Sequence, residues 1–304
     1  MACAACVFCR KEDTMTREER KEKKRQRQKA KQEFDAAMKL ELRQNKSAFR
    51  VFSVLRVLVI LTLVRQCFLG NYESVFLCGL TLLLMFVPSF IQVAFRVELP
   101  PTLEIILLCF IFAAEILGEI NEFYIRIPLW DTWLHTLNGF LAAGIGFSLA
   151  LLLNDNEELA FELSPLFLAI VAFCFSMTVG VLWEFFEFFM DHVFLLDMQK
   201  DTVIHTISSV MLDPQGRNVP VVISGIADVV VNGQSLGLGG YLDVGLIDTM
   251  KDLFVNFIGA VVFSSLGYVY VKRRGDGVAG RFIPQKKTAE QDYLTQIKEQ
   301  NREK

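Results

Sequence analysis

The chain has 304 residues, of which 53% are hydrophobic and 21% are charged, and its formal net charge is −3. A soluble domain of this length alternates apolar and polar residues. Here the apolar residues form long runs, and the charges collect at the two ends of the chain. This distribution excludes a soluble enzyme with an apolar core, and the small net charge only averages over unlike regions.

Several apolar runs are long enough to cross a bilayer, whose hydrocarbon core of about 30 Å requires roughly 20 helical residues. They are Val51–Leu69, Val75–Phe95, Leu103–Ile120, Leu134–Leu153, Leu166–Phe189 and Leu253–Val271. The predicted fold class is therefore an all-α integral membrane protein, a bundle of about six transmembrane helices.

Lys and Arg gather outside these runs: of the 31 in the chain, 15 lie in the first 50 residues and 9 follow Val271. Positively charged flanks stay in the cytoplasm, so both termini are expected on the inner side of the cell membrane and the helix number is even. We expect a charged cytoplasmic tail over residues 1–50, a transmembrane domain over 51–271 and a basic cytoplasmic tail over 272–304. Within the first tail, Thr16–Gln44 predicts a solvated or membrane-surface helix.

Two further segments lie outside the bundle. Cys3, Cys6 and Cys9 form an incomplete metal-ligand set, for which reduced, unliganded thiols are expected. The longest loop, residues 192–246, falls on the extracytoplasmic side. Its β-branched stretch Val219–Val231 ends at Asn232-Gly233, a hairpin turn signal, so we predict an extracytoplasmic hairpin loop.

Polar residues recur at helical spacing near the extracytoplasmic ends of four predicted helices, so each set shares one helical face. The sets are Glu115, Glu119 and Glu122; Asp131, His135 and Asn138; Glu184, Glu187 and Asp191; and Asp248, Asp252 and Asn256, with Lys251 beside the last. A carboxylate inside a bilayer costs at least about 2.5–3.5 kcal/mol. We therefore expect these side chains to turn inward and form one acidic pocket that shares protons, binds a cation, or does both.

Carboxylates together with an imidazole suit a divalent Mg, Mn or Zn ion. The expected metal ligands are Asp131, His135, Glu184 and Asp252, and the expected catalytic carboxylates are Glu187 and Asp248. The other pocket candidates are Glu115, Glu119, Asn138, Asp191, Lys251 and Asn256. Two alternatives stay open: the asparagines as hydrogen-bonding contacts between helices, and Glu122 and Asp191 as interface residues.

Three motifs enclose these polar sets. They are Ile127-Pro128-Leu129-Trp130-Asp131-Thr132-Trp133-Leu134-His135, Trp183-Glu184-Phe185-Phe186-Glu187, and Asp248-Thr249-Met250-Lys251-Asp252-Leu253-Phe254-Val255-Asn256-Phe257-Ile258-Gly259-Ala260. Over about Glu115 to Gly267 the chain resembles the YjdF family of uncharacterised bacterial inner-membrane proteins. More distantly, the D-x-x-x-H, E and D-x-x-x-N-x-x-G pattern is similar to VanZ-like proteins, which are associated with glycopeptide resistance. The resemblance implies a multi-pass protein of the cell membrane and no established reaction.

Three functions stay open at this point. The first is a membrane enzyme or lipid-headgroup binder that uses a divalent cation on a lipid or cell-envelope precursor. The second is a proton-coupled transporter, although no inverted repeat or broken helix marks a midplane site. The third is a non-enzymatic protein whose polar cluster locks the bundle and whose hairpin loop binds an envelope protein. The lipid bilayer is a partner in each, and no nucleic acid is expected.

Overall fold

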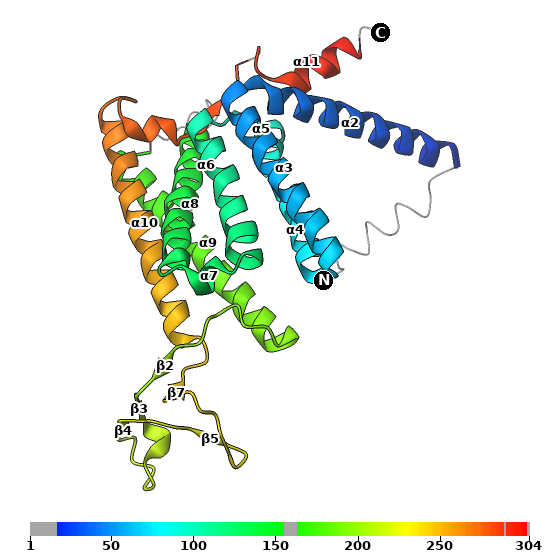
Figure 1. Ribbon diagram of the computed structural model, residues 1–304. Coiled ribbons are helices and arrows are strands. Elements are labelled where there is room, and N and C mark those ends of the chain that lie inside the picture. The colour runs from blue at the N-terminus through cyan, green and yellow to red at the C-terminus, as the bar shows by residue number, and fades with distance from the viewer. Residues whose placement is uncertain (1–16, 155–162, 289, 303–304) are drawn as a thin grey trace. The chain divides into compact units, whose positions relative to one another are not determined.

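The computed structural model describes residues 17–154, 163–288 and 290–302, and its chain divides into two compact units (Figure 1). Unit 1 consists of Met1–Asn121 and Pro284–Lys304, and unit 2 consists of Glu122–Ile283. Helices dominate both units, which confirms the predicted all-α class. The N-terminal cysteines Cys3, Cys6 and Cys9 lie outside the described residues.

Unit 1 contains the first membrane helices and the C-terminal segment. Its elements are α2 (Arg17–Gln44), α3 (Lys46–Leu69), α4 (Tyr72–Leu84), α5 (Val87–Ala94), β1 (Val97–Glu98), α6 (Pro101–Phe112), a π-helical segment (Ala113–Ile120), β8 (Gln285–Lys286) and α11 (Tyr293–Gln300). Asn45 caps α3 by accepting the Ser47 amide at 3.2 Å, and Gly70 ends the helix in the left-handed conformation. Pro88 lies in the first turn of α5, where its missing N–H is tolerated, so the predicted span is divided there.

Unit 2 is built on three long helices. Its elements are α7 (Phe123–Arg126), α8 (Trp130–Asn154), α9 (Pro165–Phe194), β2 (Val203–Ile204), β3 (Thr206–Ser209), a short 3₁₀ turn (Val210–Leu212), β4 (Val221–Ser224), β5 (Val230–Val231), β6 (Gln234–Ser235), β7 (Tyr241–Leu242), α10 (Leu246–Lys272) and a second 3₁₀ turn (Val278–Arg281). In Figure 1 the strands of this unit lie beyond one end of α9 and α10. β5 and β6 pair around Asn232 and Gly233, the hairpin turn that the sequence predicted.

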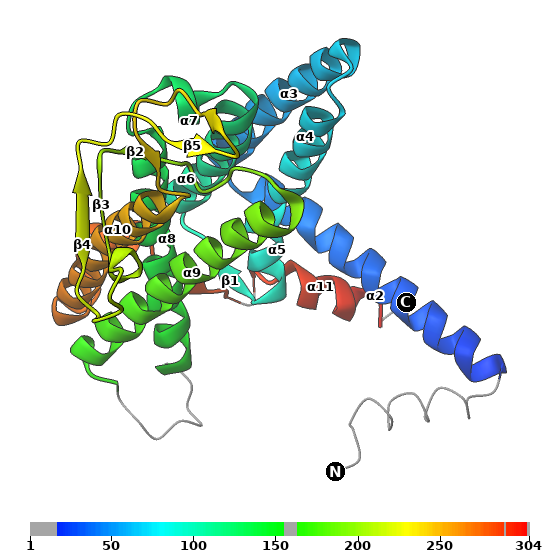
Figure 2. The same ribbon diagram turned by 90° about the horizontal axis from the view of Figure 1, so that it is seen from below.

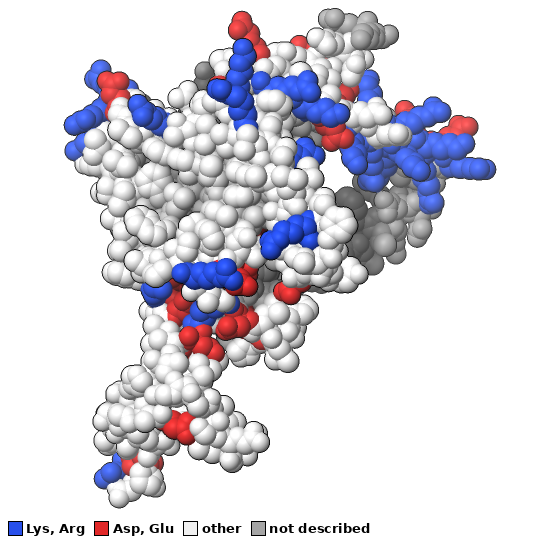
Figure 3. Space-filling view, viewed as in Figure 1, with Lys and Arg blue, Asp and Glu red and all other residues white. Residues whose placement is uncertain are grey.

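Five of the described helical stretches are long and apolar enough to cross a membrane. They are Lys46–Leu69, Tyr72–Ala94, Trp130–Leu153, Pro165–Phe194 and Leu246–Lys272. The remaining predicted span, Leu103–Ile120, is formed by α6 and the π-helical segment, so a total of six stays a prediction. Figure 3 shows that the surface formed by α10 carries its charges near the two ends of the helix and leaves an uncharged belt between them, as a bilayer requires.

The helices α8 and α10 are in backbone contact, because each has a glycine at the crossing. A Cβ atom on Gly139 would collide with the backbone of Asn256, and one on Gly259 would collide with the backbone of Thr136. Close packing through small residues is a principal source of helix association in lipid, where apolar burial contributes little. Toward the C-terminal ends of these helices, α8 and α10 pack in an apolar core that includes Phe147 and Phe263, both fully buried.

A buried ion pair ties the C-terminal segment to α2 within unit 1. Lys287 Nζ bonds to Glu41, and the two side chains are only 2% and 0% exposed. Burial raises the pKa of the Glu41 carboxyl, whereas the Lys287 ammonium lowers it. β8 pairs with β1, and Gln291 donates to Glu98 at 2.6 Å, so the pair stands inside a wider set of contacts.

We expect Gly139→Ala and Gly259→Ala to destabilise the protein, because each adds a Cβ that the facing backbone cannot accommodate. Overpacking of this kind costs about 1–3 kcal/mol, which corresponds to a melting temperature lower by roughly 3–10 °C. Thermal unfolding of detergent-purified protein measures the change. Gly79→Ala in α4 is the matched control, since its Cβ meets nothing within 4 Å. Equal melting temperatures for all three variants would contradict the proposed role of the crossing.

We expect Lys287→Met to be strongly destabilising, because it leaves the Glu41 carboxylate buried without its cation. Breaking a buried pair from one side costs about 3–5 kcal/mol, whereas replacing both members by apolar groups is often neutral. The double variant Lys287→Met/Glu41→Leu should therefore recover most of the lost melting temperature. A double variant no more stable than Lys287→Met alone would show that the ion pair itself is not the source of the loss.

Candidate metal centre

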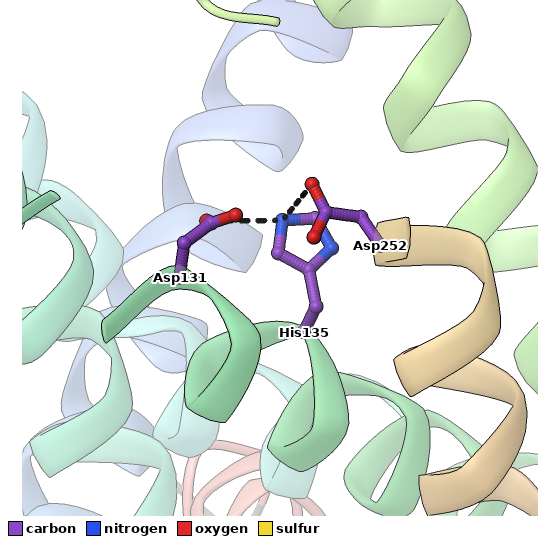
Figure 4. Close-up of side chains that lie close together, drawn as sticks. All are labelled: Asp131, His135 and Asp252. Atoms are coloured by element: carbon purple, nitrogen blue, oxygen red, sulfur yellow. Dashed lines mark ion pairs between the residues drawn. The ribbon is translucent and has the colours of Figure 1, made fainter. Parts of the chain in front are cut away.

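Three of the predicted metal ligands come together at one end of unit 2. Asp131 and His135 lie one turn apart at the start of α8, and Asp252 lies in the second turn of α10. Figure 4 shows the imidazole between the two carboxylates, with His135 Nε2 at 3.4 Å from Asp131 Oδ1 and 3.8 Å from Asp252 Oδ2. One ligand atom from each residue lies within 4.8 Å of the other two.

These separations suit a shared metal ion better than direct hydrogen bonds. Protein N–H···O bonds measure about 2.7–3.2 Å. Two ligand atoms that bind one ion at about 2.1 Å in tetrahedral geometry lie roughly 3.4 Å apart. Asp252 is only 1% exposed, and its Oδ1 has no hydrogen-bond partner among the described residues. A buried carboxylate oxygen in this condition requires a proton or a cation.

A network of amides and hydroxyls holds the three long helices together one turn below this group. Asn138 Nδ2 donates to Asn256 Oδ1 at 3.3 Å, which links α8 to α10. Asn256 Nδ2 in turn donates to the backbone oxygen of Ser176 on α9 at 3.4 Å, and Ser176 Oγ donates to the backbone oxygen of Gly139 at 2.7 Å. Asn138 and Asn256 therefore make the hydrogen bonds between helices that were one interpretation of their sequence positions.

Glu184 and Glu187 of α9 border the centre without joining the group of three. They are 4% and 7% exposed. Trp183 Nε1 donates to Glu187 Oε1 at 2.9 Å. Glu184 Oε2 is buried and has no hydrogen-bond partner in the described part of the chain. Glu184 was expected as a fourth ligand and lies outside the set of atoms that are mutually within 4.8 Å.

Two other candidate carboxylates hold the loop that follows α9. Asp191 accepts the backbone amides of Met198 and Gln199 at 2.6 and 2.8 Å. Asp248 Oδ2 accepts the amide of Lys200 at 2.9 Å. Asp191 thereby fixes residues 198 and 199 to the end of α9, and Asp248 fixes Lys200 to the start of α10, so both make positioning contacts. The catalytic role expected for Asp248 stays a prediction.

Sequence reasoning missed two features of the same loop. Asp243 accepts the amides of Thr202 and Ile247 at 2.7 and 2.9 Å, so it joins the loop to the first turn of α10. An aspartate shortly before an apolar helical run is a capping signal that could have identified it. Gln199 Nε2 donates to Thr249 Oγ1 at 2.6 Å, a contact that spans 50 positions and has no signal in the spacing.

The remaining candidates differ in their surroundings. Glu115 and Glu119 lie on the π-helical segment of unit 1, and their place in a pocket with the unit 2 residues stays a prediction. Glu122 is exposed and pairs with Arg126 at 2.6 Å. Lys251 is exposed beside Asp252, and its charge acts on Asp131 and Asp248.

Fold and centre together define a multi-pass membrane protein whose helical bundle carries a partly buried Asp–His–Asp group at one end. A family model described as "Predicted membrane protein (DUF2238)" matches residues 49–273, from α3 to the end of α10. The chain belongs to this family, which is the YjdF type that the motifs indicated. No curated protein and no solved structure matches the chain.

We expect Asp191→Ala to loosen the loop, because it removes a charged acceptor from two backbone amides. Hydrogen bonds to charged groups contribute about 1.5–3 kcal/mol each, so trypsin should cleave after Lys200 at least about tenfold faster. Cleavage after Arg217, which pairs with Asp213 elsewhere in the loop, should not change and serves as an internal reference. Asp228→Ala, which removes only a contact to Ser235, is the control variant. Unchanged cleavage after Lys200 in Asp191→Ala would refute the anchoring role.

Proposed function

We propose that this protein binds a divalent cation through Asp131, His135 and Asp252 and uses it to bind or transform a lipid or cell-envelope precursor. The observation that carries the proposal is the convergence of three ligand atoms within 4.8 Å of one another. The buried, unpartnered Oδ1 of Asp252 supports it, because an unneutralised carboxylate at this depth is costly.

The extracytoplasmic face is the proposed location of the centre. Lys272, Arg273 and Arg274 stand at the opposite end of α10 from Asp252. Basic residues next to a membrane helix favour the cytoplasmic side, which leaves the centre on the outer side and both chain termini inside. The proposed organisation is a cytoplasmic tail over residues 1–50, a membrane domain over 51–271 with the loop 192–246 outside, and a second cytoplasmic tail over 272–304.

A centre with three protein ligands leaves at least one coordination position for water or a substrate oxygen, as catalytic metal sites do. A divalent ion there would polarise a phosphoryl or carbonyl oxygen and lower the pKa of a bound water. Glu187, which is buried beside the centre, is the proposed general base. Two carboxylates and one imidazole suit Zn, Mn or Mg, and Glu184 is the nearest further oxygen donor on α9.

A lipid is the favoured substrate because an apolar groove begins at the level of the centre. The groove has a volume of about 360 Å³, and its lining includes Trp130, Leu137 and Phe140 of α8 and Val262 of α10. Trp130 lies at the end of the groove next to Asp131. Its Nε1 is buried with no hydrogen-bond partner among residues 17–154, 163–288 and 290–302. A tail in this groove would bring a polar headgroup to the level of Asp131.

A structural lock without a metal is the second candidate. It is favoured by the position of His135 between two carboxylates, since a protonated imidazole there would form an ion triad that joins α8 to α10. The two candidates predict opposite results on addition and removal of divalent ions.

The deciding experiment is elemental mass spectrometry on the detergent-purified full chain after incubation with Zn, Mn or Mg salts. We expect about one ion per chain and a melting temperature that rises with ion concentration. The free energy of unfolding should increase by about 2.7 kcal/mol when the ion concentration is 100 times the dissociation constant. Asp252→Asn and His135→Ala should lose both the ion and the shift. Asp248→Asn, one turn away on the same helix, should retain both.

Absence of an ion, absence of a metal-dependent shift and a lower melting temperature of Asp252→Asn in metal-free buffer would together reject the metal centre. That combination is what the ion triad predicts, because Asp252→Asn then removes one of its two negative charges.

A further inference from the structure

The N-terminal half of α2 extends into solvent on every side. All residues from 17 to 32 are exposed, and Lys and Arg outnumber Asp and Glu by nine to three there. From Glu33 onward, α2 has a buried face formed by Glu33, Ala37 and Glu41. Lys29 Nζ donates to the backbone oxygen of Asn301 at 3.5 Å. A helix that is polar all round is stabilised by pairs between its own side chains or by bridging to another surface.

The cations of this segment are not evenly distributed around the helix. Five of them follow the alternating spacing of three and four residues that keeps side chains on one helical face. They are Arg17, Arg20, Lys24, Arg27 and Lys31, and we refer to them as the basic stripe. Glu19 and Glu22 fall on the opposite side of the helix at 100° per residue.

The same spacing continues into residues that pack on a membrane helix. The next two positions after Lys31 are Phe34 and Met38, both partly buried. The Phe34 ring lies 5.6 Å from the ring of Phe90 in α5, which belongs to the membrane span Tyr72–Ala94. Because α2 is one continuous helix, Phe34 lies about 60° from the middle of the basic stripe at 100° per residue, so the stripe is exposed next to the face that contacts α5.

The connection to α3 keeps the stripe close to the bilayer surface. Only Asn45 separates α2 from α3, which is a membrane span. In Figures 1 and 2, α2 leaves the start of α3 at a wide angle instead of continuing its direction. The 28 residues of α2 span about 42 Å, and the wide angle directs this length along the level at which the spans begin instead of away from it.

We propose that the basic stripe binds anionic lipid headgroups of the leaflet at which α3 begins. Lys and Arg side chains can lay their apolar stems along the interface and place their charges among the phosphates. Each such cation strengthens attachment to an anionic surface by roughly fivefold. A nucleic acid or an acidic protein would also match the charge. The lipid is favoured because the stripe adjoins the contact of Phe34 with a membrane span, and only Asn45 separates α2 from the span α3.

The test uses the full chain in nanodiscs of phosphatidylcholine, with or without about 30% phosphatidylglycerol. Hydrogen exchange of the amides of residues 17–32 is followed by mass spectrometry. We expect exchange at least about tenfold slower in the anionic discs, and loss of this protection in about 0.5 M salt, where surface charges are screened.

A pair of matched variants separates the stripe from net charge. Lys24→Glu/Arg27→Glu reverses two charges of the basic stripe, and Lys21→Glu/Arg25→Glu reverses one Lys and one Arg beside it. Only the first should abolish the protection by anionic lipid. Equal exchange in the two lipid compositions, or equal loss in the two variants, would overturn the proposal. Protection by an added DNA oligonucleotide but not by anionic lipid would also overturn it, and would identify a nucleic-acid surface instead.

Discussion

The contact between the backbones of α8 and α10 sets the geometry of the candidate centre. Gly139 meets Asn256, and Gly259 meets Thr136, at distances that leave no room for a side chain. His135 stands one turn before Gly139, and Asp252 stands one turn before Asn256. The imidazole and the carboxylate are therefore brought to within 3.8 Å by the glycines one and two turns further along, because helical side chains move with their backbone.

The polar groups beside this contact differ along the bundle in how fully they are hydrogen-bonded. The Asn138–Asn256–Ser176 network satisfies its members with one another, whereas Asp252 and Glu184 each keep a buried carboxylate oxygen without a partner. On the far side of the network the core is apolar and closely packed around Phe263. Among the described residues of unit 2, the buried carboxylate oxygens without a partner thus lie at one end of the three long helices, away from the apolar core around Phe263.

Much of the fold was predictable because length and apolarity are local properties of the chain. The closeness of Asp131 and His135 followed from their spacing on one helix. The closeness of this pair to Asp252 followed from the predicted topology, which put both helix ends at the same depth in the membrane. Hydropathy placed the start of the last span at Leu253, whereas α10 begins at Leu246, since helical hydrogen bonding continues past the apolar run into the polar stripe. The loop anchors were not predictable, because they depend on how a strand-rich connection returns to the helix ends.

Hydrogen-bond partners divide the acidic residues into two groups that spacing alone cannot distinguish. Asp191, Asp243 and Asp248 accept backbone amides of the loop, so their charge is already offset and their orientation is fixed. Asp252 and Glu184 lie deeper and each have an oxygen left over. Polar sets that look equivalent in the sequence therefore differ in the hydrogen bonds that their carboxylates make. The anchoring carboxylates hold the loop to the ends of α9 and α10, whereas the deeper ones keep an oxygen without a partner among the described residues.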